Sequence, residues 1–333
     1  MEKMKKHFLR RLALVMALLT LTSALLAGCG EKPEPKPDPK DDEVIVQPEP
    51  VETPVDVAAA QKKWVDLIGY IQVPNAAQCA ISEGHWLAQS PKSTQSSTGY
   101  DDDYYLNHTL DGVINKAGEL YIQAYYNKGD LSDPMTVIYG HNMANRSQFG
   151  GLQSYGETMK FSDEDVVNIY QAGRQLTYKF FACIPYDTSH ILYYHDFKDE
   201  KVFNAFFEAL GKAANDTKYK SDTNQNAFYS AAGSVNVDKA NLPVAGDKVL
   251  VLSVCKNGDD NHRYLLMAKL VEDSSTPIVM TKEQAEAEGI AADRIMTRKE
   301  AEAAGITIPD TAAAGQTGAA AANGTNTTDN KQN

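Results

Sequence analysis

A cysteine and an arginine stand eight residues apart near the end of the chain, and together they could support acyl transfer. Cys255 closes the apolar run KVLVLSVC, and Arg263 opens the next one, RYLLMAKLV. If the two runs are adjacent antiparallel strands, Arg263 returns beside Cys255. A thiolate there would be a nucleophile, and a guanidinium would face the developing oxyanion. The alternative is an inert buried thiol, since free cysteine is among the most buried residues.

Cysteine catalysis also needs a proton donor for the leaving group, and His141 is the best placed of the seven histidines. It follows the β-rich run PMTVIYG, directly after a glycine. Cys79 and Cys183 have apolar neighbours and are expected in the core. Cysteines so widely spaced imply no disulfide framework, and no His/Cys cluster has zinc-ligand spacing, so neither a metal nor a cofactor is expected.

The apolar runs predict a mostly β domain with few helices. Short β-rich runs such as TVIYG, DVVNIYQ and QLTYKFFACIPY are bounded by Gly, Pro, Asp or Asn. The segment DEKVFNAFFEALGKAA, at about 199–214, predicts an amphipathic helix from apolar side chains spaced three and four apart. A shorter amphipathic helix is predicted from residue 58. This balance favours a closed or nearly closed barrel.

Several of these stretches, taken in order, resemble the sortase family, and class B best. They are LIGYIQVPN, DDDYYLNHTLDGVINKAGELYI, SDPMTVIYGHNM, FGGLQSY, VLVLSVC and RYLLMAKLV, which together span about residues 62–272. The resemblance implies an eight-stranded β-barrel with N-terminal helices and a helix inserted before the strand of the catalytic cysteine. The segment at 199–214 fits that inserted helix.

The resemblance also implies a catalytic triad of His141, Cys255 and Arg263. Sortases cut the C-terminal sorting signal of surface proteins, hold the acyl part as a cysteine thioester and pass it to a cell-wall amine. The expected partners are therefore such surface proteins and an amine of peptidoglycan or its precursor. Further candidates for substrate binding or tuning adjoin the triad in sequence: Asn142, Ser253, Val254 and His262.

Two features depart from the usual sortase pattern. Val254 stands where sortases usually carry threonine, so a hydroxyl contact to the substrate would be lost. The stretch SEGHWLAQSPKSTQSSTGY lengthens the entry segment, which predicts that His85 and Trp86 lie on a surface excursion. Two rival functions stay open: a cysteine endopeptidase acting mainly by hydrolysis, and a non-catalytic lipoprotein that uses a sortase barrel to bind peptides.

The N-terminus has the pattern of a lipoprotein signal at residues 1–28. A basic start precedes a 16-residue apolar stretch, shorter than the roughly 20 residues of a membrane span. The stretch ends in Leu-Ala-Gly before Cys29, which resembles a bacterial lipobox. We therefore expect a lipid on Cys29 and a location at the extracellular face of the cell membrane.

Residues 29–57 are predicted to form a solvated acidic stalk, because seven of the 14 prolines fall within residues 31–57. The net charge is −12 for the whole chain, and since residues 1–28 contribute +4, the rest would carry −16. This balance argues against nucleic acid as a partner and against electrostatic adhesion to anionic lipid. Membrane attachment would depend on the lipid.

The segment after the predicted catalytic domain (58–272) contains a short repeat. MTKEQAEAEGI begins at residue 280 and MTRKEAEAAGI at residue 296. Each copy has a threonine cap, Gln or Glu three residues later, and a glycine before an isoleucine. These signals predict two short helices, each with a capping box and a Schellman-type end, within residues 273–308. The Ala/Gly/Thr/Asn-rich tail, 309–333, is predicted to be disordered.

Overall fold

The structure is a computed structural model, and it describes residues 43–74, 76–86, 100–157, 160–188, 190–213, 235–256 and 259–309. The predicted signal peptide, Cys29, the first part of the predicted stalk and nearly all of the predicted tail lie outside these residues. The chain divides into residues 1–43 and 44–333, and the features below belong to the second part, apart from Glu43. None of the described helices is long and apolar enough to span a membrane.

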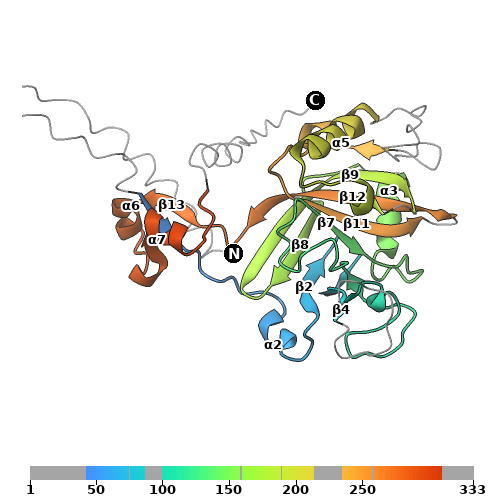
Figure 1. The fold of residues 1–333 in the computed structure, drawn as a ribbon, viewed down its shortest axis with the longest axis horizontal. Helices are drawn as coiled ribbons and strands as arrows, with labels where there is room; N and C mark the ends of the chain where they lie inside the picture. The colour runs from blue at the N-terminus through green and yellow to red at the C-terminus, as the bar shows by residue number, and fades with distance from the viewer. Residues whose placement is uncertain are drawn as a thin grey trace, which may run out of the picture. The chain divides into compact units, whose positions relative to one another are not determined.

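Eight strands close into a barrel (Figure 1). Around the ring the order is β9-β12-β11-β7-β6-β3-β2-β8, and β8 pairs back with β9. The strands are β2 (Leu67–Gln72), β3 (Gln78–Ser82), β6 (Leu120–Tyr121), β7 (Met135–Tyr139), β8 (Val166–Gln171), β9 (Arg174–Asp187), β11 (Val249–Lys256) and β12 (Asp259–Asp273). The predicted eight-stranded barrel is confirmed. Outside the ring, β10 (Asn236–Val237) pairs with β9, and β4 (His85–Trp86) pairs with β5 (Tyr100–Asp101).

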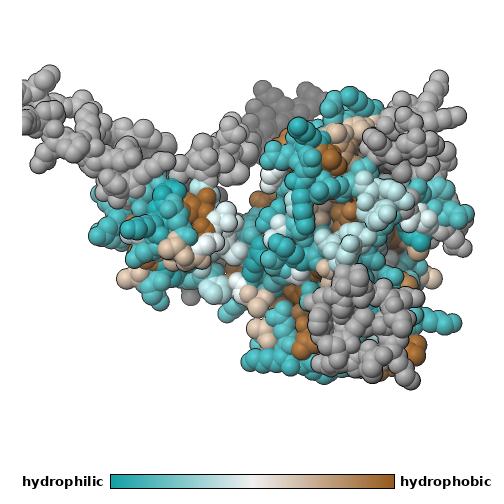
Figure 2. All heavy atoms as spheres, viewed as in Figure 1, coloured by the Kyte–Doolittle hydropathy of each residue, from teal (hydrophilic) through white to brown (hydrophobic). Residues whose placement is uncertain are grey.

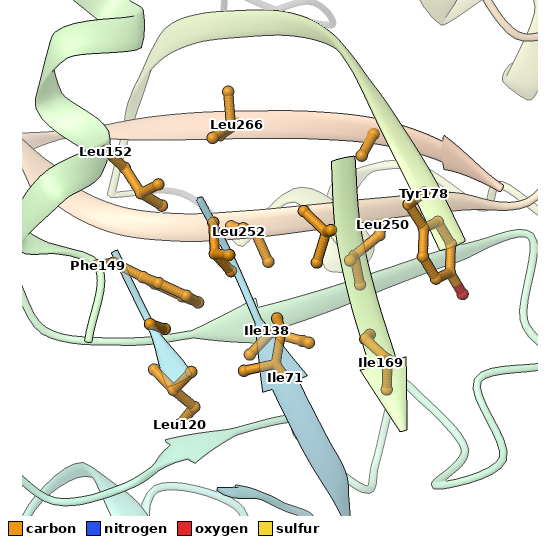
Figure 3. Close-up of a cluster of buried hydrophobic side chains, with 14 of the residues drawn as sticks. Ile71, Leu120, Ile138, Phe149, Leu152, Ile169, Tyr178, Leu250, Leu252 and Leu266 are labelled. Atoms are coloured by element: carbon orange, nitrogen blue, oxygen red, sulfur yellow. The ribbon is translucent and has the colours of Figure 1, made fainter. Parts of the chain in front are cut away.

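The barrel interior is filled by one cluster of buried apolar side chains (Figure 3). Leu250 and Leu252 of β11 lie there with Ile138 of β7 and Leu266 of β12. Side chains alternate between the two faces of a strand, so the residues between these point outward. Those outward side chains, Val251 and Leu265 among them, belong to a second buried cluster.

The second cluster is covered by α5 (Glu200–Ala213), the predicted helix between β9 and β11. Its phenylalanines and Leu210 pack against the outward face of β11 and β12. Both faces of β11 are therefore buried, which explains why KVLVLS is a continuous apolar run rather than an alternating one. Hydrophilic residues dominate the face of the molecule drawn in Figure 2, where apolar residues form only small patches.

The remaining barrel helices are short. The predicted N-terminal helical part is, among the described residues before β2, the single helix α2 (Val57–Gln61). Asp56 caps it by accepting a hydrogen bond from the Ala59 N–H at 2.9 Å. The others are α3 (Gln153–Glu157), α4 (Ile191–Tyr194) and the 3₁₀ turns η3 (Tyr104–Leu106), η4 (Gly150–Leu152) and η6 (Lys239–Asn241).

The C-terminal repeat forms two helices with the predicted end structures. They are α6 (Lys282–Ala287) and α7 (Arg298–Ala303), and each begins with a capping box. After α6, Gly289 has a φ of 67° and its N–H bonds to the Glu286 carbonyl, while the Ile290 N–H bonds to the Ala285 carbonyl. This pair of bonds is a Schellman motif, and the same pair closes α7.

The predicted stalk is wrong for residues 43–46. They form β1 (Glu43–Val46), the middle strand of a sheet in which β13 (Ile278–Thr281) and β14 (Ile295–Thr297) flank it. Val44, Ile45 and Val46 are buried, and Val44 and Val46 pack with Ala285 of α6. An apolar triplet gains more from this burial than from a solvated polyproline conformation. The 3₁₀ turn η7 (Ala292–Arg294) precedes β14.

Candidate active site

Cys255 and Arg263 are cross-strand partners. They are Cα partners in the antiparallel pair of β11 and β12, as expected from their sequence positions. Directly opposed residues project from the same face, and both side chains line a cavity of about 260 Å³. A register shift follows immediately after Cys255, and bulges of this kind are frequent beside active sites. The Gln153 side chain donates to the Cys255 carbonyl at 3.1 Å, which ties α3 to this strand end.

His141 reaches the same cavity from the end of β7. A Cβ at the preceding Gly140 would lie 2.4 Å from a Leu120 methyl and 2.5 Å from the Phe149 ring, so no larger residue fits there. The Gly140 N–H also donates to the Ser253 carbonyl at 3.2 Å. The loop that carries His141 is therefore pressed against the barrel directly beside β11.

The His141 ring is oriented by a main-chain carbonyl. Nε2 lies 2.8 Å from the carbonyl oxygen of Leu106, in η3. A carbonyl only accepts hydrogen bonds, so Nε2 carries a proton and Nδ1 is the nitrogen left to exchange protons with a substrate. This arrangement is compatible with both the neutral and the protonated ring.

The backbone of His141 is held by Gln148. The His141 N–H donates to Gln148 Oε1 at 2.8 Å, and the amide nitrogen of Gln148 bonds to the Ala117 carbonyl. Gln148 has a φ of 46°, in the left-handed region that non-glycine residues rarely occupy. The side chain of this one residue, whose backbone is strained, thus connects the His141 loop to the turn at residues 115–118.

The additional candidates divide into those at the cavity and those away from it. Ser253 is buried and lines the cavity. Asn142 forms an isolated bridge with Gln148 and is outside the cavity lining. His262 is also outside that lining; its carbonyl accepts from the Arg263 guanidinium at 3.1 Å.

Val254, which the sequence suggested for substrate binding or tuning, lies outside the cavity lining. Its side chain is 1% exposed and belongs to the cluster inside the barrel. Strand alternation explains this: Ser253 and Cys255 face the cavity, so the residue between them faces inward. The valine found where sortases usually have threonine therefore affects the core, not the cavity wall.

Of the two other described cysteines, Cys183 is a core residue and Cys79 is half-buried. Cys183 is fully buried and Cys79 packs against the same interior cluster. Burial raises the pKa of the Cys79 thiol to about 12, with a smaller contribution from Glu119, and burial also raises the pKa of Cys183. Both thiols stay protonated near neutral pH and cannot compete with Cys255 as nucleophiles.

Sequence reasoning missed His190, which also lines the cavity. Its Nε2 lies 3.0 Å from the Tyr139 hydroxyl and also contacts Gln123 Oε1, and its ring stacks on Tyr126 with centroids 4.1 Å apart. Burial lowers its pKa, so the ring is neutral near pH 7. His190 follows the end of β9 by three residues, but only the barrel closure brings that end to the cavity. Two carboxylates, Asp103 and Asp187, complete the polar wall.

The fold and the site together define a closed β-barrel with a candidate cysteine–histidine–arginine centre. Within the described ranges, no group of three or more His, Cys, Asp or Glu side chains is arranged to hold a metal ion. A thiol, an imidazole and a guanidinium line one cavity, and this arrangement suits acyl transfer.

Comparisons with known proteins agree with this class. The chain is similar to Sortase B of Listeria monocytogenes, at 26% identity over 174 residues, which cover 51% of this chain and 61% of that protein. It thus spans less than two thirds of the relative's length. No family model matches the chain. The sequence similarity supports a sortase.

The chain is also similar to parts of two solved sortase structures. One is a Staphylococcus aureus sortase B–substrate complex, with a TM-score of 0.47, 14% identity, and coverage of 65% of this chain and 84% of that chain. Another is sortase B from B. anthracis in complex with AAEK2, with a TM-score of 0.44, 20% identity, and coverage of 68% and 89%.

Proposed function

We propose that this protein is a class B-like sortase, a cysteine transpeptidase that uses Cys255, His141 and Arg263. The observation that carries the proposal is the placement of these three side chains around one cavity, with Cys255 and Arg263 as cross-strand partners. The similarity to sortase B supports it.

In the first half of the reaction the Cys255 thiolate attacks the scissile carbonyl of a bound peptide. A carbon–sulfur bond forms, and Arg263 stabilises the tetrahedral oxyanion with its guanidinium donors. Protonated His141 then gives its proton to the departing amine as the carbon–nitrogen bond breaks. The product is a thioester on Cys255, with the C-terminal fragment released.

In the second half an acceptor amine attacks the thioester. Neutral His141 takes a proton from the amine, the new amide forms, and Cys255 leaves as a thiolate. The Leu106 carbonyl accepts from Nε2–H in both halves, so the ring keeps one orientation while its other nitrogen gains and loses the proton.

The substrate is a C-terminal sorting signal of a surface protein, and the acceptor is an amine of the cell wall or its precursor. The protein acts at the extracellular face of the membrane, held by a lipid on Cys29. The basic start, short apolar stretch and Leu-Ala-Gly-Cys sequence support this location.

Mass spectrometry of Cys255 tests the proposal. The purified protein is incubated with a library of candidate sorting peptides, and the expected result is an acyl adduct on Cys255 that disappears when an amine such as triglycine or diaminopimelate is added. The Cys255→Ala protein is the control. Acyl transfer to water at the same rate with and without amine would indicate an endopeptidase, and the absence of any adduct would contradict the proposal.

A further inference from the structure

A histidine–carboxylate pair, His85 with Asp66, lies outside the cavity lining. Asp66 is a buried carboxylate directly before β2. Its Oδ2 lies 2.6 Å from His85 Nδ1 and accepts from the Tyr105 hydroxyl at 2.7 Å. Since a carboxylate only accepts, Nδ1 of His85 carries a proton. His85 belongs to the β4–β5 pair outside the barrel ring, and its ring is held by the buried Asp66 carboxylate.

The pair holds η3 through aromatic stacking. The His85 ring stacks on Tyr104 with centroids 4.3 Å apart, and Tyr104 stacks on His108 at 4.0 Å. Tyr105, bonded to Asp66, packs edge-on against Tyr104 at 5.1 Å. Two consecutive residues of η3 are thus fixed to the buried carboxylate, one by a hydrogen bond and one through the His85 ring.

The next residue of η3 is Leu106, whose carbonyl orients His141. This carbonyl belongs to the main chain, so its position depends on the packing of the turn that carries it. Nothing in the described contacts of Asp66 or His85 reaches the cavity lining directly. Asp66 and His85 can therefore affect the reaction through their contacts with Tyr104 and Tyr105, which position the neighbouring Leu106 carbonyl.

We propose that Asp66 and His85 are positioning residues for His141, acting through η3. The inference rests on the proposed function, because it assigns His141 the role of general acid. Proton transfer to a leaving group requires hydrogen-bond reach, and small misplacements are costly in rate. A shifted Leu106 carbonyl would let the His141 ring rotate and carry Nδ1 out of hydrogen-bond reach of the leaving group.

The test compares two leaving groups in single-turnover acylation of Cys255. A peptide amide must receive a proton as its amine leaves, whereas an activated ester of the same acyl group, such as a p-nitrophenyl ester, leaves without one. We expect His85→Ala to slow acylation by the peptide about tenfold and to leave acylation by the ester within about twofold of wild type.

His85→Phe separates the two contacts, because it keeps a ring against Tyr104 but loses the bond to Asp66. We expect a smaller loss with the peptide, and Asp66→Asn should give the same leaving-group pattern. The matched control is Asp111→Asn: Asp111 is exposed and binds Lys63 and Trp64, so both substrates should react at wild-type rates.

Equal loss with both substrates, or no loss with either, in folded His85→Ala and His85→Phe proteins would overturn the inference and leave the pair with a purely structural role. Failure of the proposed function has a different signature, since the wild-type protein would then form no acyl adduct with any peptide. That result would remove the inference together with the proposed function.

Discussion

The two sides of the cavity are fixed by different kinds of interaction. Cys255 and Arg263 lie on central strands, where β11 pairs with β12 on one side and with β7 on the other. His141 lies in a loop, and its position depends on a Gln148 side chain, a glycine and the Leu106 carbonyl. The strand side is set by main-chain ladders that tolerate many side chains, whereas the loop side depends on particular residues.

This difference predicts how each side responds to substitution. On the strand side, only the reacting groups themselves should matter for chemistry, because both faces of the strands are packed. On the loop side, residues that never touch substrate should change the rate.

Replacing Cys255 with alanine should abolish thioester formation, with a loss of at least about 10³-fold in rate. Cys183→Ala should keep its rate and lose about 1 kcal/mol of unfolding free energy, because it removes a small group from the barrel core. Single-turnover acylation and urea unfolding measure the two effects. Retained thioester formation in Cys255→Ala, with loss in folded Cys183→Ala, would show that Cys183 is the nucleophile.

Alkylation provides an independent check on the same thiols. Burial raises the pKa of the Cys79 thiol to about 12 and also raises the pKa of Cys183. Iodoacetamide at pH 8 should therefore modify Cys255 first in the folded protein. All three should react in urea. Peptide mapping after a short exposure would reveal any other order.

Arg263→Lys should fold normally and lose about 10²-fold in kcat, the size expected when one transition-state donor is removed. Lysine keeps the charge but not the planar fork of donors. Peptide KM should change less, since the donors act mainly on the oxyanion. Acylation is measured between pH 6 and 9 beside the melting temperature. Near-normal acylation by the lysine variant would make Arg263 a structural residue of the barrel rim.

Gln148→Ala should slow acylation about tenfold by loosening the backbone of His141. Its cost in stability should be about 2 kcal/mol, because two hydrogen bonds of roughly 1 kcal/mol each are lost, one to the His141 N–H and one to the Ala117 carbonyl. Gln175→Ala is the matched control, because Gln175 bonds to Asn168 and Thr177 on β8 and β9, outside the cavity lining. A rate equal to wild type in Gln148→Ala would mean that the Leu106 carbonyl alone suffices to hold His141.

Val254→Thr should have the smallest effect on chemistry, with acylation within about twofold of wild type. It should lower stability by about 1–3 kcal/mol, because the hydroxyl enters the apolar barrel interior. Thermal unfolding and single-turnover acylation measure both. A clear gain in rate would show that the hydroxyl reaches the substrate, against the inward orientation of this position.

The sequence by itself determined the features whose interactions are local. The capping box of α6 joins Thr281 to Gln284, and its end is fixed by Gly289, so all of the information lies within nine residues. The pairing of Cys255 with Arg263 is local as well, because the two strands follow each other with little chain between them. Apolar runs likewise indicated the buried strands.

Tertiary structure alone decided the features that depend on distant segments. The apolar triplet of β1 pairs with β13 and β14, which come more than 200 residues later in the chain. The sequence around residue 43 contains no pattern that predicts this pairing. His190, the Leu106 carbonyl and the Asp66–His85 pair reach their places only when β2, β7 and β9 close the barrel. A local pattern indicates which face of a strand a side chain takes and where a helix ends. The distant segment against which a strand packs is decided by tertiary packing, and that contact must outweigh the entropy lost when the intervening chain is closed into a loop.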